Sequence, residues 1–329
     1  MAPPPGYRAE NVWHADFPPR ELIDSTAGAD GQAVGWRERS KVQDKEAVAA
    51  WFEGNVPVFS PMALTARQQA LYQMSATDYV ASRKAGTVSC LEYTTALVAR
   101  MLHHKALNCF MATSYALTGK MLSQAATLDA KAEAEGVDSI APLYGLPLPI
   151  KGTYATTDFP SCGGVGVLQH VYGRKDSKLV EVLKAAHCVV FGKTNCPEFA
   201  CGMFTLNHTN GVCRNPLNPM WSTGGSSGGS ASATAARIGT VSVTADTRGS
   251  TRCPANQCGN FGYDPPRNKH PNAGSLGTTF WRDQAGCNAS SFDDIMLCEL
   301  TVIPSSSLPF LCHLHVLSSL AVHSFCVVA

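Results

Sequence analysis

The chain has 329 residues, and its 26 basic and 25 acidic side chains give a formal net charge of +1 with histidine neutral. This balance argues against a nucleic-acid-binding protein that relies on a broad basic surface. Hydrophobic residues make up 45% of the chain, which is enough for a packed core, so wholesale disorder is excluded. A chain of this length forms one large or two medium domains, and it needs no disulfide or metal ion to assemble a core.

Charged residues make up only 16% of the chain, whereas ordinary soluble domains contain about 25%. The deficit is concentrated in two regions. Only five charged residues occur between Phe199 and Tyr263, and the 30 residues after Glu299 contain none. The first region is rich in small residues and indicates a tightly packed interior, while the second is an unusual apolar tail.

The 13 cysteines do not form a recognisable disulfide or zinc pattern. Their number is odd and no Cys-x-x-Cys pair occurs. Cys196 and Cys201, like Cys253 and Cys258, are five positions apart, which is not the usual spacing of zinc ligands. Because Met1 to Pro5 also lack a secretory signal pattern, we expect free thiols in a reducing, cytoplasmic compartment. We expect no metal and no other cofactor.

The two ends of the chain differ from its middle. Residues 1–65 are polar and contain prolines without sustained periodicity, which predicts a partly ordered extension. Residues 301–329 form the charge-free tail, and the stretch 308–329 is long enough to span a bilayer. Its histidines, serines and proline weaken the apolar signal, and no basic residue flanks it. A membrane anchor and a non-native tail from translated non-coding sequence are both open interpretations.

Helices and short apolar strands alternate along the middle of the chain. Ser89 and Glu92 have the spacing of a capping box, and apolar residues at helical spacing follow to about His104. A second helix is predicted for Ala116 to Gly136. Strands are predicted at Leu146 to Ile150, Cys188 to Phe191 and Thr240 to Ala245. This alternation indicates an α/β fold.

The most distinctive stretch is Ser222 to Ser230, rich in glycine and serine and followed by the small-residue run Ala231 to Ala236. A phosphate-binding P-loop would end in Gly-Lys-Ser/Thr, which is missing here. A flexible linker would not continue into an apolar, alanine-rich helix. The residues from Gly224 to Gly228 match the Gly-x-Ser-x-Gly nucleophile elbow, but that elbow follows a strand, whereas Asn215 to Pro219 cannot form one.

A second serine motif follows the predicted strand at 240–245. The strand would deliver Ser250 onto a tight turn, where a nucleophile and backbone N–H groups can share one loop. By itself this signal is weak, because most serines in turns are only turn residues.

Taken together, these motifs resemble the amidase signature family. In chain order they are Gly145 to Lys151, Lys193 to Phe199, Arg214 to Pro216, Gly224 to Ser230 and Asp246 to Pro254. The spacing agrees as well, with 75 residues from Lys151 to Ser226 and 24 from Ser226 to Ser250. The similarity covers residues 66–300. It implies an α/β fold with a mixed, twisted central sheet covered by helices on both faces and incomplete at the C-terminus.

The resemblance implies a Ser–Ser–Lys triad, with Ser250 as nucleophile, Ser226 as a bridging serine in a cis peptide, and Lys151 as base. The implied oxyanion hole consists of the backbone amides of Thr247, Arg248, Gly249 and Ser250. Supporting roles are implied for Ser227, Asp246 and Arg252, the last two as an ion pair that braces the turn.

Physical chemistry is consistent with these roles. A serine hydroxyl becomes a nucleophile only when a neighbouring base takes its proton. A lysine with its free pKa of about 10.4 is protonated near neutral pH and cannot act as that base. Burial behind the apolar strand would lower the pKa of Lys151 and supply the neutral amine. Taken alone, the same lysine is equally well interpreted as a surface residue at a strand end.

Two residues depart from the family pattern. Arg248 occupies the position of the first glycine of a Gly-Gly pair, and a positive φ there would cost about 1 kcal/mol or more. Loss of one oxyanion donor lowers rates about 100- to 1,000-fold. Gly152 follows the lysine where the family often has aspartate. The family also continues past the position of Glu299, so we expect reduced stability or activity.

The resemblance implies an amidase that cleaves a small-molecule amide through an acyl-enzyme. One alternative is an impaired or inactive amidase-fold protein that acts as a binding module. Another is a glutamine-hydrolysing A-type subunit of a tRNA amidotransferase, although the N-terminal extension favours a free-standing enzyme. A homodimer is left open, no nucleic acid is expected, and a membrane is a partner only through residues 308–329.

Overall fold

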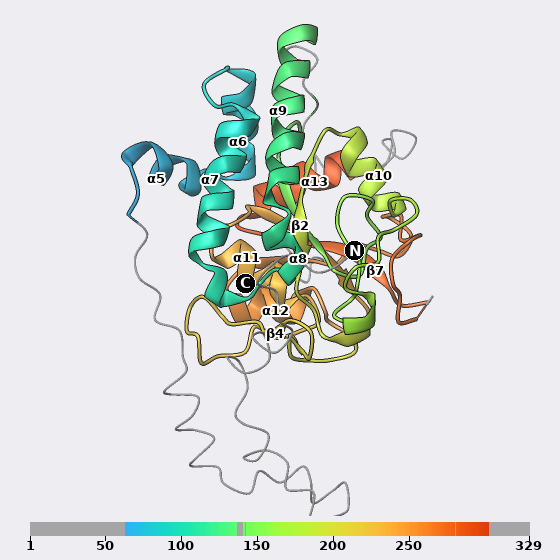
Figure 1. Cartoon of the computed structure of the whole chain (residues 1–329). Helices are drawn as coiled ribbons and strands as arrows, with labels where there is room; N and C mark the ends of the chain where they lie inside the picture. Colours follow the sequence, from blue (N-terminus) through green and yellow to red (C-terminus); the bar gives the residue numbers. More distant parts are fainter. Residues whose placement is uncertain (1–62, 137–140, 142, 280, 303–329) are drawn as a thin grey trace, which may run out of the picture.

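A mixed five-stranded sheet lies at the centre of the computed structural model, which describes residues 63–136, 141, 143–279 and 281–302 (Figure 1). The strands are β1 (Pro147–Lys151), β2 (Val189–Thr194), β5 (Val241–Asp246), β6 (Phe261–Tyr263) and β7 (Gln284–Ala289). Their order is β2-β1-β5-β7-β6. Because β1 runs parallel to β2 and β5 while β7 is antiparallel to β5 and β6, the predicted mixed sheet is confirmed.

The parallel strands bring the functional motifs to one edge of the sheet. Lys151 at the end of β1 pairs with Thr194 at the end of β2. On the other side of β1, Ile150 pairs with Val243 of β5. Since parallel strands end at the same edge, the residues that follow β1, β2 and β5 meet there. A separate two-stranded hairpin is formed by β3 (Leu206–Asn207) and β4 (Gly211–Val212).

Five of the described helices precede β1, and the other four lie between or after the strands. They are α5 (Ala66–Gln73), α6 (Ala76–Lys84), α7 (Cys90–His103), α8 (Ala112–Ala116), α9 (Thr118–Glu135), α10 (Lys178–Ala185), α11 (Gly228–Ala235), α12 (Arg252–Cys258) and α13 (Phe292–Val302). Short 3-10 turns lie at Lys105–Leu107, Gly166–Leu168 and Glu198–Ala200. Helix α11 contacts β1, β2, β5 and β7, while α7 lies beside α9 (Figure 1).

Helix α7 matches the helix predicted after Ser89, with one difference at its start. The Ser89 hydroxyl accepts a hydrogen bond from the Glu92 amide at 2.9 Å. The Glu92 carboxylate does not complete the capping box, because it pairs with Arg67 at 2.7 Å. Two apolar residues of this helix, Leu91 and Leu102, are 38% and 47% exposed. The buried face instead consists of Cys90, Tyr93, Thr94, Ala96, Leu97, Val98 and Met101.

The other predicted elements are also present. The helix predicted for 116–136 is α9, which ends at Gly136 as its C-cap. The three predicted strands correspond to β1, β2 and β5, and β2 extends to Thr194. The eleven cysteines of the described ranges are free thiols, most of them buried as small apolar core residues.

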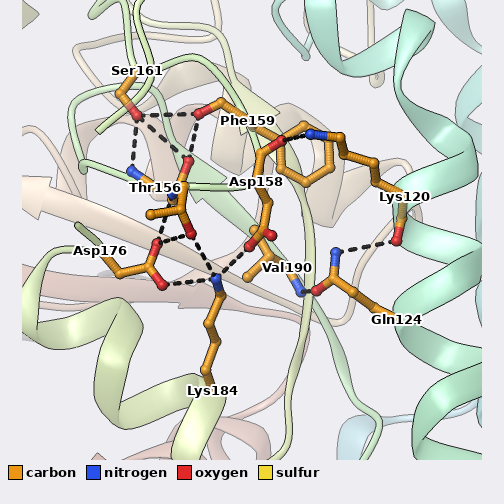
Figure 2. A network of polar contacts seen from close by, with 10 residues as sticks. Lys120, Gln124, Thr156, Asp158, Phe159, Ser161, Asp176, Lys184 and Val190 are labelled. Atoms are coloured by element: carbon orange, nitrogen blue, oxygen red, sulfur yellow. Dashed lines mark hydrogen bonds and ion pairs between the residues drawn. The ribbon is translucent and has the colours of Figure 1, made fainter. Parts of the chain in front are cut away.

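A polar network holds the long loop between β1 and α10 (Figure 2). Lys184 of α10 lies between the carboxylates of Asp158 and Asp176 and contacts the latter at 2.7 Å. Lys120 of α9 donates a hydrogen bond to the Asp158 carbonyl at 2.8 Å. Two helices therefore anchor the chain that follows Lys151.

Within these described ranges, no helix is both long and apolar enough to cross a membrane. The stretch 308–329, considered above as an anchor, lies outside them. So do residues 1–62 of the predicted extension and residues 303–329 of the charge-free tail.

Two glycines offer a matched test of packing before β1. Gly145 has φ +73°, and an added Cβ would lie 2.0 Å from the Cys90 sulfur and 2.8 Å from the Tyr79 hydroxyl. Gly86 has φ +68°, but its added Cβ would meet nothing within 4 Å. We expect Gly86→Ala to lower the free energy of unfolding by about 1–2 kcal/mol, the cost of a left-handed alanine. Gly145→Ala should cost about 1–3 kcal/mol more, because it also overpacks the core.

Urea unfolding followed by tryptophan fluorescence measures both values. Equal losses in the two variants would contradict the packing described around Gly145.

Candidate active site

Lys151 is buried at the end of β1 with 1% of its surface exposed. Its Nζ donates hydrogen bonds to the Ser226 hydroxyl at 2.8 Å and to the Ala245 carbonyl at 3.0 Å. The contact with Ala245 follows from the strand arrangement, because β1 and β5 are parallel neighbours that end at the same edge. The structure therefore brings two members of the predicted triad into direct contact.

Burial lowers the pKa of Lys151 from 10.5 to about 8. Three neighbours act in the opposite direction and favour the ammonium form, namely Cys196, Asp246 and Asp283. Burial raises the pKa of Cys196 to about 12, so this thiol is neutral near neutral pH. The two carboxylates are therefore the charges that partly offset burial, and a substantial fraction of Lys151 is a neutral amine near pH 8.

Ser226 lies in a loop that leaves no room for larger residues. The peptide bond between Gly225 and Ser226 is cis, and the Ser226 side chain is fully buried. A Cβ added to Gly225 would lie 2.7 Å from the Gly202 carbonyl oxygen. Thr205 holds both ends of the loop, since its hydroxyl donates to the Gly224 carbonyl at 2.9 Å and accepts from the Gly228 amide at 3.0 Å. This buried loop, which runs into α11, is unlike a solvated linker.

Ser227 joins the loop to the turn that carries Ser250. The Ser227 amide donates to the Ser250 carbonyl at 3.1 Å, and the Ser227 hydroxyl donates to the Ala245 carbonyl at 3.2 Å. Ser250 itself is half-buried in the turn after β5. Within the described part of the chain, no hydrogen bond joins the hydroxyls of Ser226 and Ser250. The backbone contact nevertheless places the two loops side by side.

The turn after β5 is organised by the buried Asp246 carboxylate. It accepts hydrogen bonds from the Gly249 amide at 2.5 Å, from the Thr251 amide at 3.0 Å and from Arg252 Nε at 3.1 Å. Burial raises the pKa of Asp246, but the hydrogen bonds and the charge of Arg252 outweigh it and lower the pKa below its ordinary value. The ion pair between Asp246 and Arg252 is thus present.

Two expectations about this turn change in the structure. Gly249 was expected to donate its amide to the oxyanion hole, but this amide is directed at Asp246. Arg248 was expected to be strained if its position required positive φ, yet it is not among the described non-glycine residues with positive φ. The positive φ falls on Gly249, at 109°, and Arg248 is exposed. The substitution at 248 therefore costs no left-handed strain, and the amides of Thr247, Arg248 and Ser250 are the candidate donors.

The departure at Gly152 also has a packing explanation. A Cβ added there would lie 1.9 Å from the Met111 methyl group and 3.1 Å from the Thr194 carbonyl oxygen. Met111 packs with Cys162 and Cys196 in a small apolar cluster beneath the site. An aspartate at position 152 would have to displace the end of the Met111 side chain.

No role was assigned from the sequence to three residues that shape the site, namely Thr205, Lys193 and Asp283. Lys193 is fully buried on β2, and its ammonium group contacts the Tyr154 carbonyl. Burial lowers the pKa of Lys193 from 10.5 to about 7. Asp283 directly precedes β7, which pairs with β5. A polar residue at this position was the only sequence feature that could have indicated a role for it.

A small cavity opens beside Lys151 and Ser226. It is lined by Lys151, Thr153, Ala200, Ser226, Ala245, Thr247, Ser275, Leu276, Gly277, Thr278 and Asp283. A larger hollow of about 320 Å³ lies elsewhere, among Phe204, Leu206, Met220 and Trp221. Since the described lining of that hollow contains none of the predicted catalytic residues, the smaller cavity is the candidate active site.

Comparison with known proteins assigns the chain to a family. The family profile described as Amidase matches residues 92–307. Indoleacetamide hydrolase of Agrobacterium vitis is 32% identical over 239 residues, which are 73% of this chain and 48% of that protein. The A-type subunit of the chloroplastic/mitochondrial glutamyl-tRNA(Gln) amidotransferase of Oryza sativa subsp. indica is 37% identical over 171 residues, or 52% of this chain and 32% of that protein.

Among solved structures, the native peptide amidase of Stenotrophomonas maltophilia superposes with a TM-score of 0.66 at 28% identity. The match covers 70% of this chain and 48% of the peptide amidase. The chain thus spans a third to a half of the length of these relatives. Because the family profile covers most of the chain and the structural match is extensive, the chain belongs to the amidase signature family.

Proposed function

We propose that this chain hydrolyses a small-molecule carboxylic amide through an acyl-enzyme intermediate on Ser250. The hydrogen bond of 2.8 Å between the buried Lys151 amine and the Ser226 hydroxyl carries this proposal. A buried lysine with a pKa of about 8 is a suitable proton acceptor near neutral pH. The family membership and the amide-cleaving relatives support the same reaction class.

The proposed reaction begins with proton transfer. Neutral Lys151 takes the proton of Ser226, and Ser226 takes that of Ser250, whose oxygen attacks the amide carbonyl carbon. The carbonyl oxygen gains the negative charge and is stabilised by the backbone amides of Thr247, Arg248 and Ser250. Lys151, now an ammonium, returns its proton through Ser226 to the leaving nitrogen. The C–N bond then breaks, leaving an ester on Ser250.

The second half of the reaction uses the same groups. A water molecule gives a proton to the Ser226–Lys151 pair and attacks the ester carbonyl. The Ser250 oxygen leaves and recovers its proton, which releases the carboxylic acid. The water-poor surroundings of Lys151 strengthen each electrostatic step, because fixed dipoles replace mobile solvent.

A second candidate function is glutamine hydrolysis as part of a tRNA amidotransferase. The 37% identity with the Oryza sativa amidotransferase protein favours it. Both candidates use the same three residues, so they differ only in the amide that is bound and in the partners that are required.

The nucleophile assignment predicts the target of a fluorophosphonate probe. We expect the probe to label the wild-type chain on Ser250, because only an activated serine reacts at a useful rate. Ser250→Ala should abolish labelling, whereas Ser123→Ala, which changes an exposed serine of α9, should leave it intact. Gel fluorescence and peptide mass spectrometry identify the labelled residue.

Persistent labelling of the Ser250→Ala variant would rule out this nucleophile. A wild-type chain that binds no probe and turns over no amide would favour the non-catalytic binding module instead.

The lowered pKa of Lys151 predicts the pH dependence of labelling. Only the neutral amine accepts a proton, so the rate should rise with pH through a midpoint near the Lys151 pKa of about 8 and then level off. Lys151→Met should lower the rate about 100- to 10,000-fold and remove this rise. Lys175→Met, at an exposed lysine, is the matched control. A rise that survives in Lys151→Met would assign the titration to another group.

Amide preference separates the two candidate functions. An amidase that acts alone should release ammonia from an aryl acetamide without other proteins. A glutamine-hydrolysing subunit should instead release ammonia mainly from glutamine, and faster when amidotransferase partner subunits are added. Coupled ammonia detection with both substrates distinguishes the two outcomes.

A further inference from the structure

The strand register places Asp283 directly beside the turn that carries Ser250. Strands β5 and β7 are antiparallel, with Asp246 opposite Gln284. The next position on β5 and the preceding position on β7 are therefore neighbours, and these are Thr247 and Asp283. The Thr247 hydroxyl donates a hydrogen bond to Asp283 Oδ1 at 2.5 Å.

The other carboxylate oxygen of Asp283 holds the opposite wall of the cavity. Oδ2 accepts hydrogen bonds from the Thr278 amide at 2.7 Å and from the Thr279 amide at 2.9 Å. A Cβ added to Gly277 would lie 2.6 Å from this oxygen, so the segment passes close to the carboxylate. Because Ser275 to Thr278 line the cavity, one side chain joins this segment to the turn after β5.

Asp283 also differs from the other carboxylate near Lys151. Because the Cys196 thiol is neutral, the charges that favour the ammonium form of Lys151 are those of Asp246 and Asp283. The negative charge of Asp246 is paired with the positive charge of Arg252 at 3.1 Å. The described partners of Asp283 are a hydroxyl and backbone amides, which leave its negative charge in place. Asp283 therefore differs from Asp246 in having no cation among its described hydrogen-bond partners.

We propose that Asp283 is a positioning residue for the reaction. Its carboxylate fixes Thr247 and the segment Ser275 to Thr278 on either side of the cavity, and it lines the same cavity as Lys151. The proposal rests on the proposed amidase function. It assigns to Asp283 both a geometric effect, through two hydrogen-bonded loops, and an electrostatic effect on the catalytic base.

Two substitutions separate these effects. Asp283→Asn keeps the size of the side chain but removes the charge, whereas Thr247→Val removes only the hydrogen bond. We expect both variants to lower kcat about 10- to 100-fold, because small displacements of reacting groups are costly. Only Asp283→Asn should move the rising limb of the kcat/KM profile to lower pH, since Lys151 loses a charge that favours its ammonium form.

Asp293→Asn is the control, because this carboxylate is exposed at the start of α13. It should reproduce the wild-type profile. Loss of kcat in Asp283→Asn with an unmoved limb would overturn the proposal, since a merely structural residue would behave in that way. An unchanged kcat in Thr247→Val would overturn the geometric part.

A measurement without turnover tests the same proposal independently of the proposed function. NMR titration of chains carrying ¹³C-labelled lysine follows Lys151 directly, with Lys151→Met used for assignment. A lower titration midpoint in Asp283→Asn than in Asp293→Asn supports the proposal even if no amide is hydrolysed. Equal midpoints overturn it, even in a fully active enzyme.

Discussion

The burial of the Lys151 amine is the constraint on which the surrounding structure depends. A buried amine is tolerated only where acceptors meet it, and the Ser226 hydroxyl and the Ala245 carbonyl supply them. The Ala245 carbonyl also accepts a hydrogen bond from Ser227, whose amide binds the Ser250 carbonyl. The end of β5 thus joins β1, the glycine–serine loop and the turn with Ser250.

The low charge of this region follows from the same constraint. Loops that converge on a dry site must approach one another at backbone distance, which excludes long solvated side chains. A Cβ on Gly229 would lie 2.4 Å from the Asn195 amide nitrogen, and one on Gly225 would meet the Gly202 carbonyl. Of the five charges that remain, Asp246 and Arg252 pair with each other. The compositional deficit between Phe199 and Tyr263 is therefore a property of the site.

Much of the fold could be predicted, because its signals are local. Strands β1, β2 and β5 are apolar runs with clear borders, and α7 and α9 show helical periodicity and capping residues. Strand β7 could not be predicted, since Gln-Ala-Gly-Cys-Asn-Ala has little β-propensity of its own. It becomes a strand through pairing with β5 along its length. Asp283, which directly precedes β7, was missed for the same reason.

The sequence by itself determined the family, the order of the motifs and the residue types needed for serine and lysine chemistry, because these are written in short segments at characteristic spacing. Only the tertiary structure decided which backbone groups face one another. It placed the positive φ at Gly249, directed the Gly249 amide to Asp246, and brought Asp283 beside Thr247. Such contacts depend on strand register and loop approach, which join residues distant in sequence and leave no local pattern.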